Sequence, residues 1–353
     1  MIILGIESSC DETAAAVVKD GHILLSNVVA SSMDLHVAYG GVVPEIAARS
    51  HIEAISTVIE QALDQAACTW GDIDAIAVTY GAGLGGSLLV GVLTARTLAI
   101  TKRKPLYAIN HVEAHVYANF ITETPLPGYT LPATQPEFPM LALIVSGGHS
   151  QLVLFRDHFD YTLLGQAQDD AVGEAFDKVA KLIGLPYPGG PSVGKKAREG
   201  NPHAFNFPKA RMAGKYDFSF SGIKTAVLRA AQAQIGEDFT FPSKDVPQRL
   251  SEAQKADIAA SFLRVAIETV VDKTIIAYEE FHPKSVVIAG GVAADPELRR
   301  QLAERLPLPT AYTDSKLCTD NGAMIATLGC FTALHHRPEA DPYSLDIAPN
   351  LSM

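Results

Sequence analysis

Runs of apolar residues near the start of the chain predict three β-strands followed by a long helix. The first two runs are Ile2 to Ile6 and Ala14 to Val18, and the hairpin signal Asp20-Gly21 precedes a third over 23–29. Apolar residues at helical spacing then occupy 43–66. The N-terminal block therefore follows a β-β-β-α pattern.

The same pattern returns in the middle of the chain. Strands are predicted over 140–145, 151–155 and 161–165, and helical spacing follows over 170–183. Two such blocks predict an α/β protein of two similar lobes. Each lobe would be a mixed β-sheet flanked by helices, with a central cleft between the two.

Proline positions indicate where the first lobe ends. Five prolines between 124 and 139 are too many for a helix or a central strand, and they mark a linker. We expect a first lobe over 1–132 that also takes a C-terminal helix at about 319–335. The second lobe is expected over 133–318.

Three other segments carry weaker periodicity. The stretch from Pro186 to Pro208 is expected to be irregular, within a helical and basic insertion at about 185–255. The residues after Leu334 are expected to form a loose tail. The uncharged segment Ala75 to Ala95 is long enough for a bilayer, but its five glycines favour a strand, a glycine loop and a helix, so we expect no membrane span.

Composition and charge narrow the class of protein. With 353 residues, 48% hydrophobic and 19% charged, the chain has the make-up of a globular protein with room for two domains. The net charge of −11 argues against binding nucleic acid over the whole surface, although Lys195 to Lys224 holds seven cations against two acids. The four cysteines form no C-x-x-C pair and no secretory signal is visible, so we expect a cytoplasmic protein.

Two histidines four residues apart, His111 and His115, predict a metal site. On a helix, positions i and i+4 lie on one face, so both imidazoles can reach one ion. Glu113 lies roughly 200° around the helix from His111, which does not match the H-E-x-x-H pattern of zinc proteases. Asp320, before an apolar C-terminal helix, is the candidate third ligand, or it caps that helix. The alternative is an amphipathic helix with two unrelated histidines.

Three polar turns that follow apolar strands have the composition of phosphate-binding loops. The turn over 7–13 contains Asp11, a carboxylate where phosphate or metal chemistry would occur, or else a residue that shapes the turn. The other two contain Gly147-Gly148 and Gly290-Gly291, which let the backbone approach an anion closely. Further candidate site residues are Ser9, Glu12, Glu174, Gly290 and Gly291.

An acidic face is predicted on the helix at 170–183. Asp170, Glu174 and Asp177 follow i, i+4, i+7 spacing, so their like charges share one face and repel. That repulsion favours an external counter-charge or hydroxyl donors, such as a metal ion or a sugar. The alternative is a solvated helix face.

Together these motifs resemble the bacterial TsaD family (formerly Gcp or YgjD) of tRNA threonylcarbamoyladenosine enzymes, within the actin-like ATPase superfold (ASKHA, RNase H-like). The matching segments, in chain order, are IESSCDET at 6–13, GVVPE at 41–45, HVEAH at 111–115, VSGGH at 145–149, GEAFDK at 173–178, YPGGP at 187–191, FSFSGIKT at 218–225 and TDNGAM at 319–324.

The resemblance implies an activity, cofactors and partners. The enzyme would transfer L-threonylcarbamoyl from threonylcarbamoyl-AMP to N6 of adenosine 37 in tRNAs that read codons beginning with A. One divalent metal ion, Fe²⁺ or Zn²⁺, would be held by His111, His115 and Asp320, and Mg-ATP is a further implied nucleotide. Implied partners are tRNA, the degenerate paralogue TsaB, the P-loop ATPase TsaE and a TsaC-type synthase that supplies the adenylate.

The resemblance also implies which residues contact the nucleotide. Asp11 is expected to position the reacting amine or accept its proton. Asp295 departs from the family pattern, which has asparagine there, so the side chain has lost its amide donors and gained a charge. The implied contacts are Ile144, Val145, Ser146, Gly147, Gly148, Asp177, Gly190 and, with this departure, Asp295.

Three rival functions share some of these features. A small-molecule kinase of the same superfold would have the phosphate turns and Asp11 without a histidine pair. A metalloendopeptidase would need a glutamate that acts on metal-bound water, and Glu113 lies on the wrong face. A non-catalytic scaffold would not need the histidine pair and the glycine turns in one chain.

Overall fold

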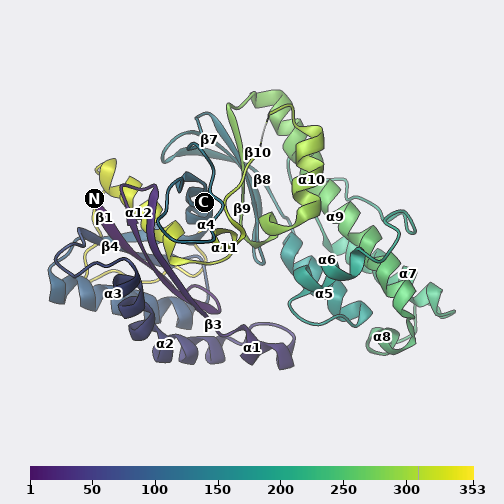
Figure 1. The fold of residues 1–353 in the computed structure, drawn as a ribbon. Coiled ribbons are helices and arrows are strands. Elements are labelled where there is room, and N and C mark those ends of the chain that lie inside the picture. The colour runs from purple at the N-terminus through teal and green to yellow at the C-terminus, as the bar shows by residue number, and fades with distance from the viewer. Residues whose placement is uncertain (309) are drawn as a thin grey trace. The chain divides into compact units, whose positions relative to one another are not determined.

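The first sheet is built around the apolar strand at the start of the chain. The computed structural model describes residues 1–308 and 310–353. Strand β1 (Ile2–Glu7) pairs antiparallel with β2 and parallel with β4, within the order β3-β2-β1-β4-β5 (Figure 1). The other strands are β2 (Glu12–Lys19), β3 (Ile23–Ser31), β4 (Ala75–Gly81) and β5 (Leu106–Asn110).

Helices cover both faces of this sheet, which is why β1 and β2 are almost continuously apolar. Leu4 and Ile6 pack in one core with residues of α2 (Pro44–Gln65) and α3 (Gly85–Lys102). Gly5 points to the other face, where a Cβ would lie 2.4 Å from the backbone nitrogen of Ala326 in α12. Glycine therefore lets α12 lie directly on β1. The remaining helices of this part are α1 (Met33–His36), α4 (His111–Tyr117), α11 (Ser315–Cys318) and α12 (Gly322–Leu334), with 3-10 turns at Val37–Tyr39 and Ala118–Phe120.

The second sheet repeats the first, as the hydrophobic pattern predicts. Its central strand β6 pairs antiparallel with β7 and parallel with β9, and the order is β10-β9-β6-β7-β8. Each strand thus has a counterpart at the same place in the first sheet. The strands are β6 (Met140–Val145), β7 (Ser150–Asp157), β8 (Asp160–Gln166), β9 (Ser285–Ala289) and β10 (Thr310–Ala311).

One helix corrects the expectation of an irregular stretch from Pro186 to Pro208. Helix α6 (Gly189–Ala197) begins after Pro188 and contains Pro191 in its first turn. The N–H groups of a first turn have no acceptor inside the helix, so proline costs little there. The other helices of this part are α5 (Val172–Ile183), α7 (Ser221–Gln234), α8 (Val246–Arg249), α9 (Glu252–Phe281) and α10 (Pro296–Arg305), with 3-10 turns at Ser243–Asp245 and Gly291–Ala294.

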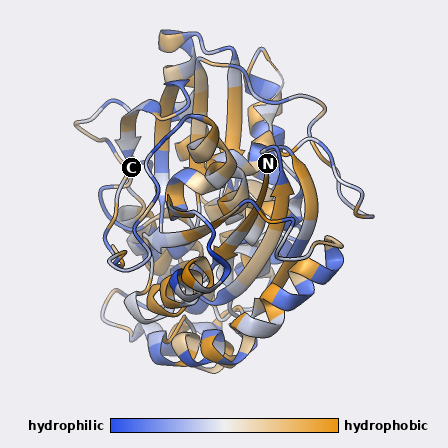
Figure 2. Cartoon of the chain, turned by 90° about the vertical axis from the view of Figure 1, so that its left-hand side faces the viewer, coloured by the Kyte–Doolittle hydropathy of each residue, from blue (hydrophilic) through white to orange (hydrophobic). Residues whose placement is uncertain are grey.

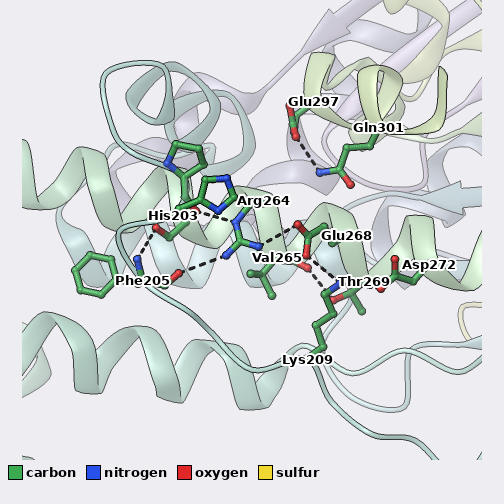
Figure 3. A network of polar contacts seen from close by, with 12 residues as sticks. His203, Phe205, Lys209, Arg264, Val265, Glu268, Thr269, Asp272, Glu297 and Gln301 are labelled. Atoms are coloured by element: carbon green, nitrogen blue, oxygen red, sulfur yellow. Dashed lines mark hydrogen bonds and ion pairs between the residues drawn. The ribbon is translucent and has the colours of Figure 1, made fainter. Parts of the chain in front are cut away.

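Helix α9 anchors the chain that follows α6. Arg264 donates from Nε to the carbonyl of Pro202 and from Nη1 to Glu268, while Lys209 pairs with Glu268 and Asp272 (Figure 3). A segment without regular backbone pairing is thereby fixed by charged side chains of a long helix.

The chain divides into two compact units, which we call unit 1 (1–136 with 311–353) and unit 2 (137–310).

The strands are largely orange in Figure 2, whereas the helices alternate between orange and blue, as expected where a helix packs one face on a core. Among the described residues, no helix has both the length and the apolar character needed to cross a bilayer.

The C-terminal tail is anchored, which corrects the expectation of a loose segment after Leu334. Arg96 on α3 donates hydrogen bonds to the carbonyls of Pro342, Tyr343 and Leu345. The backbone N–H of Ala348 donates to the carbonyl of Tyr80 at 2.7 Å. The tail's prolines prevent a periodic element, but they leave carbonyls that a distant arginine can bind.

Candidate functional site

Helix α4 places two imidazoles beside one carboxylate in unit 1. The side chain of Asn110 caps this helix by accepting from the N–H groups of Val112 and Glu113. Asp320 Oδ1 lies 3.6 Å from His111 Nε2 and 3.3 Å from His115 Nε2. One ligand atom from each of the three residues lies within 4.8 Å of the others. Two imidazoles and a carboxylate form a donor set that suits Zn²⁺ or Fe²⁺.

The burial of these groups fits a cation. His115 is 1% exposed, and neither of its ring nitrogens has a hydrogen-bond partner among the described residues. Buried polar atoms without partners are rare, so this pair calls for a ligand. Burial lowers the pKa of His111, but Asp320 and Glu7 outweigh it and raise the pKa to about 9. The cluster thus concentrates negative charge around the imidazoles, as a metal centre requires.

Asn321, and not Asp320, caps the C-terminal helix. The Asn321 side chain accepts from the N–H of Met324 and donates to the carbonyls of Leu317 and Thr319. Asp320 is therefore not the capping residue of this helix, because Asn321 already caps its first turn. Glu113 is also buried, and burial raises its pKa to about 7, but it is not part of the donor cluster.

The turn after β1 is held by its backbone. Cys10 O receives hydrogen bonds from His51 Nε2 and Ser87 Oγ, and Asp11 O receives them from the N–H and hydroxyl of Ser32. The N–H of Leu84 donates to the carbonyl of Ser9. These contacts to backbone carbonyls hold the conformation of the turn.

This turn carries its acids close to Asp320. Burial, and then the charges of Asp320 and Asp11, raise the pKa of Glu12 to about 9. The same three causes raise the pKa of the Cys10 thiol far above its usual value. Its surroundings therefore disfavour the charged form of Glu12. Of the candidates in this turn, Ser9 contacts one of the candidate metal-binding residues directly, because its Oγ lies 3.1 Å from Nδ1 of His111.

Unit 2 brings the glycine turns together around the end of β6. A Cβ on Gly173 would lie 2.5 Å from Ser146 O, and one on Gly290 would lie 2.5 Å from Val145 O. Gly290 has a φ of +88°, which favours glycine. By contrast, a Cβ on Gly147 or Gly148 would meet nothing within 4 Å, so their backbone is open to a ligand. Gly291 starts the 3-10 turn that follows.

Asp177 and Asp295 are both held by backbone N–H groups. Asp177 Oδ1 accepts from the N–H of Gly189 at 2.6 Å, which places the start of α6 beside α5. Asp295 caps α10 by accepting from the N–H groups of Glu297 and Leu298. Burial raises the pKa of both carboxyls. A Cβ on Gly190 would again meet nothing within 4 Å. Ile144 and Val145 are fully buried at the end of β6.

The acidic face on α5 has an internal counter-charge, which corrects the expectation of an external one. Lys178 Nζ lies 2.6 Å from both Asp170 Oδ1 and Glu174 Oε1. Asp177 turns to Gly189, and Asp170 precedes the helix, which begins at Val172. A lysine one turn away neutralises the repulsion that the spacing alone predicts.

Several cations of the basic stretch are likewise paired. Lys196 contacts Glu199 and Glu252, and Lys215 contacts Glu280. These acids come largely from α9, so the net charge counted along 195–224 overstates the positive charge that the surface presents.

Sequence reasoning missed one residue beside the candidate metal cluster. Glu7, the last residue of β1, is fully buried, and its Oε2 lies 3.1 Å from His111 Nδ1. Burial alone would raise its pKa, but the contact with His111 lowers it. The only sequence signal was a carboxylate at the end of an otherwise apolar strand.

Comparisons with known proteins show the family of this chain. The family model described as TsaD, tRNA N6-adenosine threonylcarbamoyltransferase, matches residues 23–327. A protein of that description from Thermomicrobium roseum is 50% identical, over 94% of this chain and 92% of its own length. Another, from Desulfitobacterium hafniense, is 46% identical over 99% of this chain and 97% of its own. The solved structure of T. kodakarensis HypF covers 96% of this chain and 48% of that chain, with a TM-score of 0.60 and 13% identity, a likeness of fold alone.

Proposed function

The chain belongs to the TsaD family, the tRNA N6-adenosine threonylcarbamoyltransferases, and we propose that it performs this transfer with a metal ion held by His111, His115 and Asp320. It is a tRNA-modifying transferase of the actin-like fold. The observation that carries the metal proposal is the buried cluster in which neither nitrogen of His115 has a hydrogen-bond partner among the described residues. Family membership rejects the kinase and endopeptidase alternatives.

The donor in this proposal is threonylcarbamoyl-AMP, and the acceptor is N6 of adenosine 37 in tRNAs that read codons beginning with A. The amine nitrogen attacks the carbamoyl carbon, the bond from that carbon to the phosphate oxygen breaks, and AMP leaves. The proton lost by N6 passes to Asp11. Because the mixed anhydride is already activated, the protein has mainly to position the amine and stabilise developing charge.

The adenylate is assigned to the turns of unit 2. The open backbone of Gly147, Gly148 and Gly190 suits an anion, because a side chain would occupy that space. Ser146 keeps the turn closed, because its N–H donates to the carbonyl of His149 and its Oγ accepts from the N–H of His149. Asp177 and Asp295 are fixed acceptors for hydroxyl groups. Mg-ATP would use the same turns.

The metal would be Fe²⁺ or Zn²⁺, since both accept two imidazoles and a carboxylate. When bound, it would supply Lewis-acid stabilisation of the negative charge that develops on the donor. His111 and His115 would hold it through ring nitrogens, and Asp320 through a carboxylate oxygen.

The partners proposed from family membership are tRNA, the paralogue TsaB, the ATPase TsaE and a TsaC-type synthase. We place the reaction in the cytoplasm, which fits a tRNA substrate and the free thiols of Cys10, Cys68, Cys318 and Cys330.

The test compares purified wild type with the double variant His111→Ala, His115→Ala. Wild type is expected to retain about one equivalent of metal and to transfer threonylcarbamoyl in a reconstituted assay, and the variant to lose both while keeping its circular dichroism spectrum. The variant His203→Ala, His336→Ala, which removes two exposed imidazoles, is the control. Stoichiometric metal in the first variant, or full activity of metal-stripped wild type, overturns the proposal.

A further inference from the structure

The end of β1 places a buried carboxylate behind one metal-binding histidine. Glu7 has no exposed surface, and its Oε2 lies 3.1 Å from Nδ1 of His111. Nδ1 is the ring nitrogen that faces away from Asp320, because Nε2 is the one 3.6 Å from the Asp320 carboxylate. Glu7 and Asp320 therefore act on opposite nitrogens of the same ring.

Two other groups fix the Glu7 carboxylate. Thr79 Oγ1 on β4 donates to Oε2 at 2.5 Å, and the N–H of Ser9 donates to Oε1 at 2.5 Å. Both oxygens are thus occupied by donors, and the carboxylate plane is set by β1, β4 and the following turn. Such a carboxylate can accept a hydrogen bond from an imidazole N–H, and its other hydrogen bonds keep it from rotating away from the ring.

A fully buried carboxylate needs a reason, because removing a charge from water is costly unless it is paired. An alanine or a valine at the end of this apolar strand would fill the core without that cost. The side chain that can pair with this carboxylate is His111, whose Nδ1 lies 3.1 Å from Oε2. The geometry therefore couples the charge of Glu7 to His111 and not to a distant structural ion pair.

The contact also determines where the His111 proton lies. An ionised carboxylate has no proton to donate, so Nδ1 must carry the hydrogen in the contact with Glu7. The Ser9 hydroxyl, 3.1 Å from the same nitrogen, then serves as a second acceptor. When a metal ion displaces the proton of Nε2, the Glu7 contact keeps the hydrogen on Nδ1, and the lone pair is then on Nε2, which faces Asp320. His115 has no hydrogen-bond partner at either nitrogen among the described residues, so the constraint is specific to His111.

We propose that Glu7 is the positioning residue of the metal centre: it holds the His111 ring with the proton on Nδ1 and presents the Nε2 lone pair to the ion. This inference rests on the proposed metal function. Carboxylates behind metal-binding histidines fix the tautomer and make the imidazole a stronger ligand, and their loss typically weakens metal binding by about 10- to 100-fold.

The experiment measures the metal affinity of wild type and Glu7→Gln, with Zn²⁺ in competition with a chelator. Glutamine has the same shape, but it cannot satisfy its surroundings. If its oxygen accepts from Nδ1, its amide faces the N–H of Ser9, and if it is flipped, its amide forces the other tautomer on His111. We expect Zn²⁺ affinity to fall by about 10- to 100-fold, and the long-range ¹H–¹⁵N spectrum of zinc-bound His111 to change from the Nδ1–H pattern of wild type.

The matched control is Ser26→Ala, which breaks another buried side-chain hydrogen bond in unit 1, the one that the N–H of Val17 donates to Ser26 Oγ at 3.0 Å. It is expected to lower the melting temperature of the metal-free protein while leaving Zn²⁺ affinity within about twofold. Melting temperatures measured with excess chelator separate lost stability from lost affinity.

The outcomes distinguish this inference from the proposed function. If wild type binds no Zn²⁺, or if the double histidine variant binds as tightly as wild type, the metal function itself is wrong. Wild-type affinity in Glu7→Gln, beside normal binding by wild type, overturns only the role of Glu7. Should the variant fail to fold, the wild-type spectrum alone decides, because an Nε2–H pattern on zinc-bound His111 contradicts the proposal.

Discussion

At the scale of single residues, the backbone and the side chain of Asp11 have different roles. The turn around it is shaped by hydrogen bonds to its backbone carbonyl from Ser32, and not by its carboxylate. In the proposed reaction this carboxylate accepts the proton of the amine, and we expect its replacement by an amide to leave the turn intact.

We predict that Asp11→Asn folds and binds metal normally but loses transfer activity by about 10²- to 10⁴-fold, because an amide cannot accept the proton of N6. Single-turnover transfer to tRNA measures the effect, and Asp34→Asn, at an exposed acid, is the control. A transfer rate near that of wild type would reduce Asp11 to a residue of the turn.

The histidine pair could be predicted from the sequence because both residues lie on one short helix, where spacing decides which side chains meet. Apart from the family resemblance, Asp320 was a candidate because it precedes an apolar helix, and its neighbour Asn321 proved to be the cap. Glu7 could not be predicted, because its partners Thr79 and His111 lie on other elements. Contacts between elements leave no periodic trace.

At the scale of elements, Asp169 ties two segments of unit 2 together. Its carboxylate accepts from the hydroxyls of Ser219 and Ser221 and from the N–H of Phe220, just before α7. Partial burial would raise its pKa, but these hydrogen bonds outweigh burial and hold the pKa below its usual value.

A depressed pKa stabilises the folded state above the pKa of the unfolded chain, near 4. This stability is lost as pH falls through the lower folded value. We predict that Asp169→Asn costs about 1 kcal/mol at pH 7 and progressively less as pH falls below 4, with faster hydrogen exchange over 218–224. The measurement is urea unfolding at pH 7 and at a pH below 4, with Glu279→Gln as an exposed control. An equal cost at both pH values would contradict the role of the charge.

The ion pairs of the basic stretch reduce the number of its cations that we expect to contact tRNA. Lys196, Lys209 and Lys215 are paired with acids, so reversing them would disturb folding contacts. We predict that Arg198→Glu with Arg211→Glu lowers tRNA affinity and flattens its salt dependence, because fewer counterions are released. Lys244→Glu with Lys284→Glu changes the net charge equally and is the control. An unchanged salt slope would place the tRNA contact elsewhere.

At the scale of the whole molecule, the repeat of two sheets follows from the hydrophobic pattern, because strand and helix periods are local properties of the chain. The C-terminal tail does not. Its contacts with Arg96 and Tyr80 join positions far apart in sequence, and its prolines prevent a periodic pattern from which a fixed element could be predicted.

We predict that Arg96→Ala lowers the free energy of unfolding by about 2 kcal/mol, because one guanidinium satisfies three carbonyls. It should also expose 339–353 to limited proteolysis. Arg49→Ala, at an exposed arginine of α2, serves as the control. If the tail of the Arg96 variant resists protease as well as wild type does, other contacts hold it.

Unit 1 is assembled from both ends of the chain, with unit 2 inserted between them. On the ribosome, His111 and His115 therefore emerge long before Asp320, and all of unit 2 is made in the interval. Domains can fold as they emerge, but a nascent chain that stops before α12 lacks both the third ligand and the helix that covers β1. If these three residues hold a metal ion as proposed, only a chain translated almost to its end has all of them, and an interrupted product lacks the complete site.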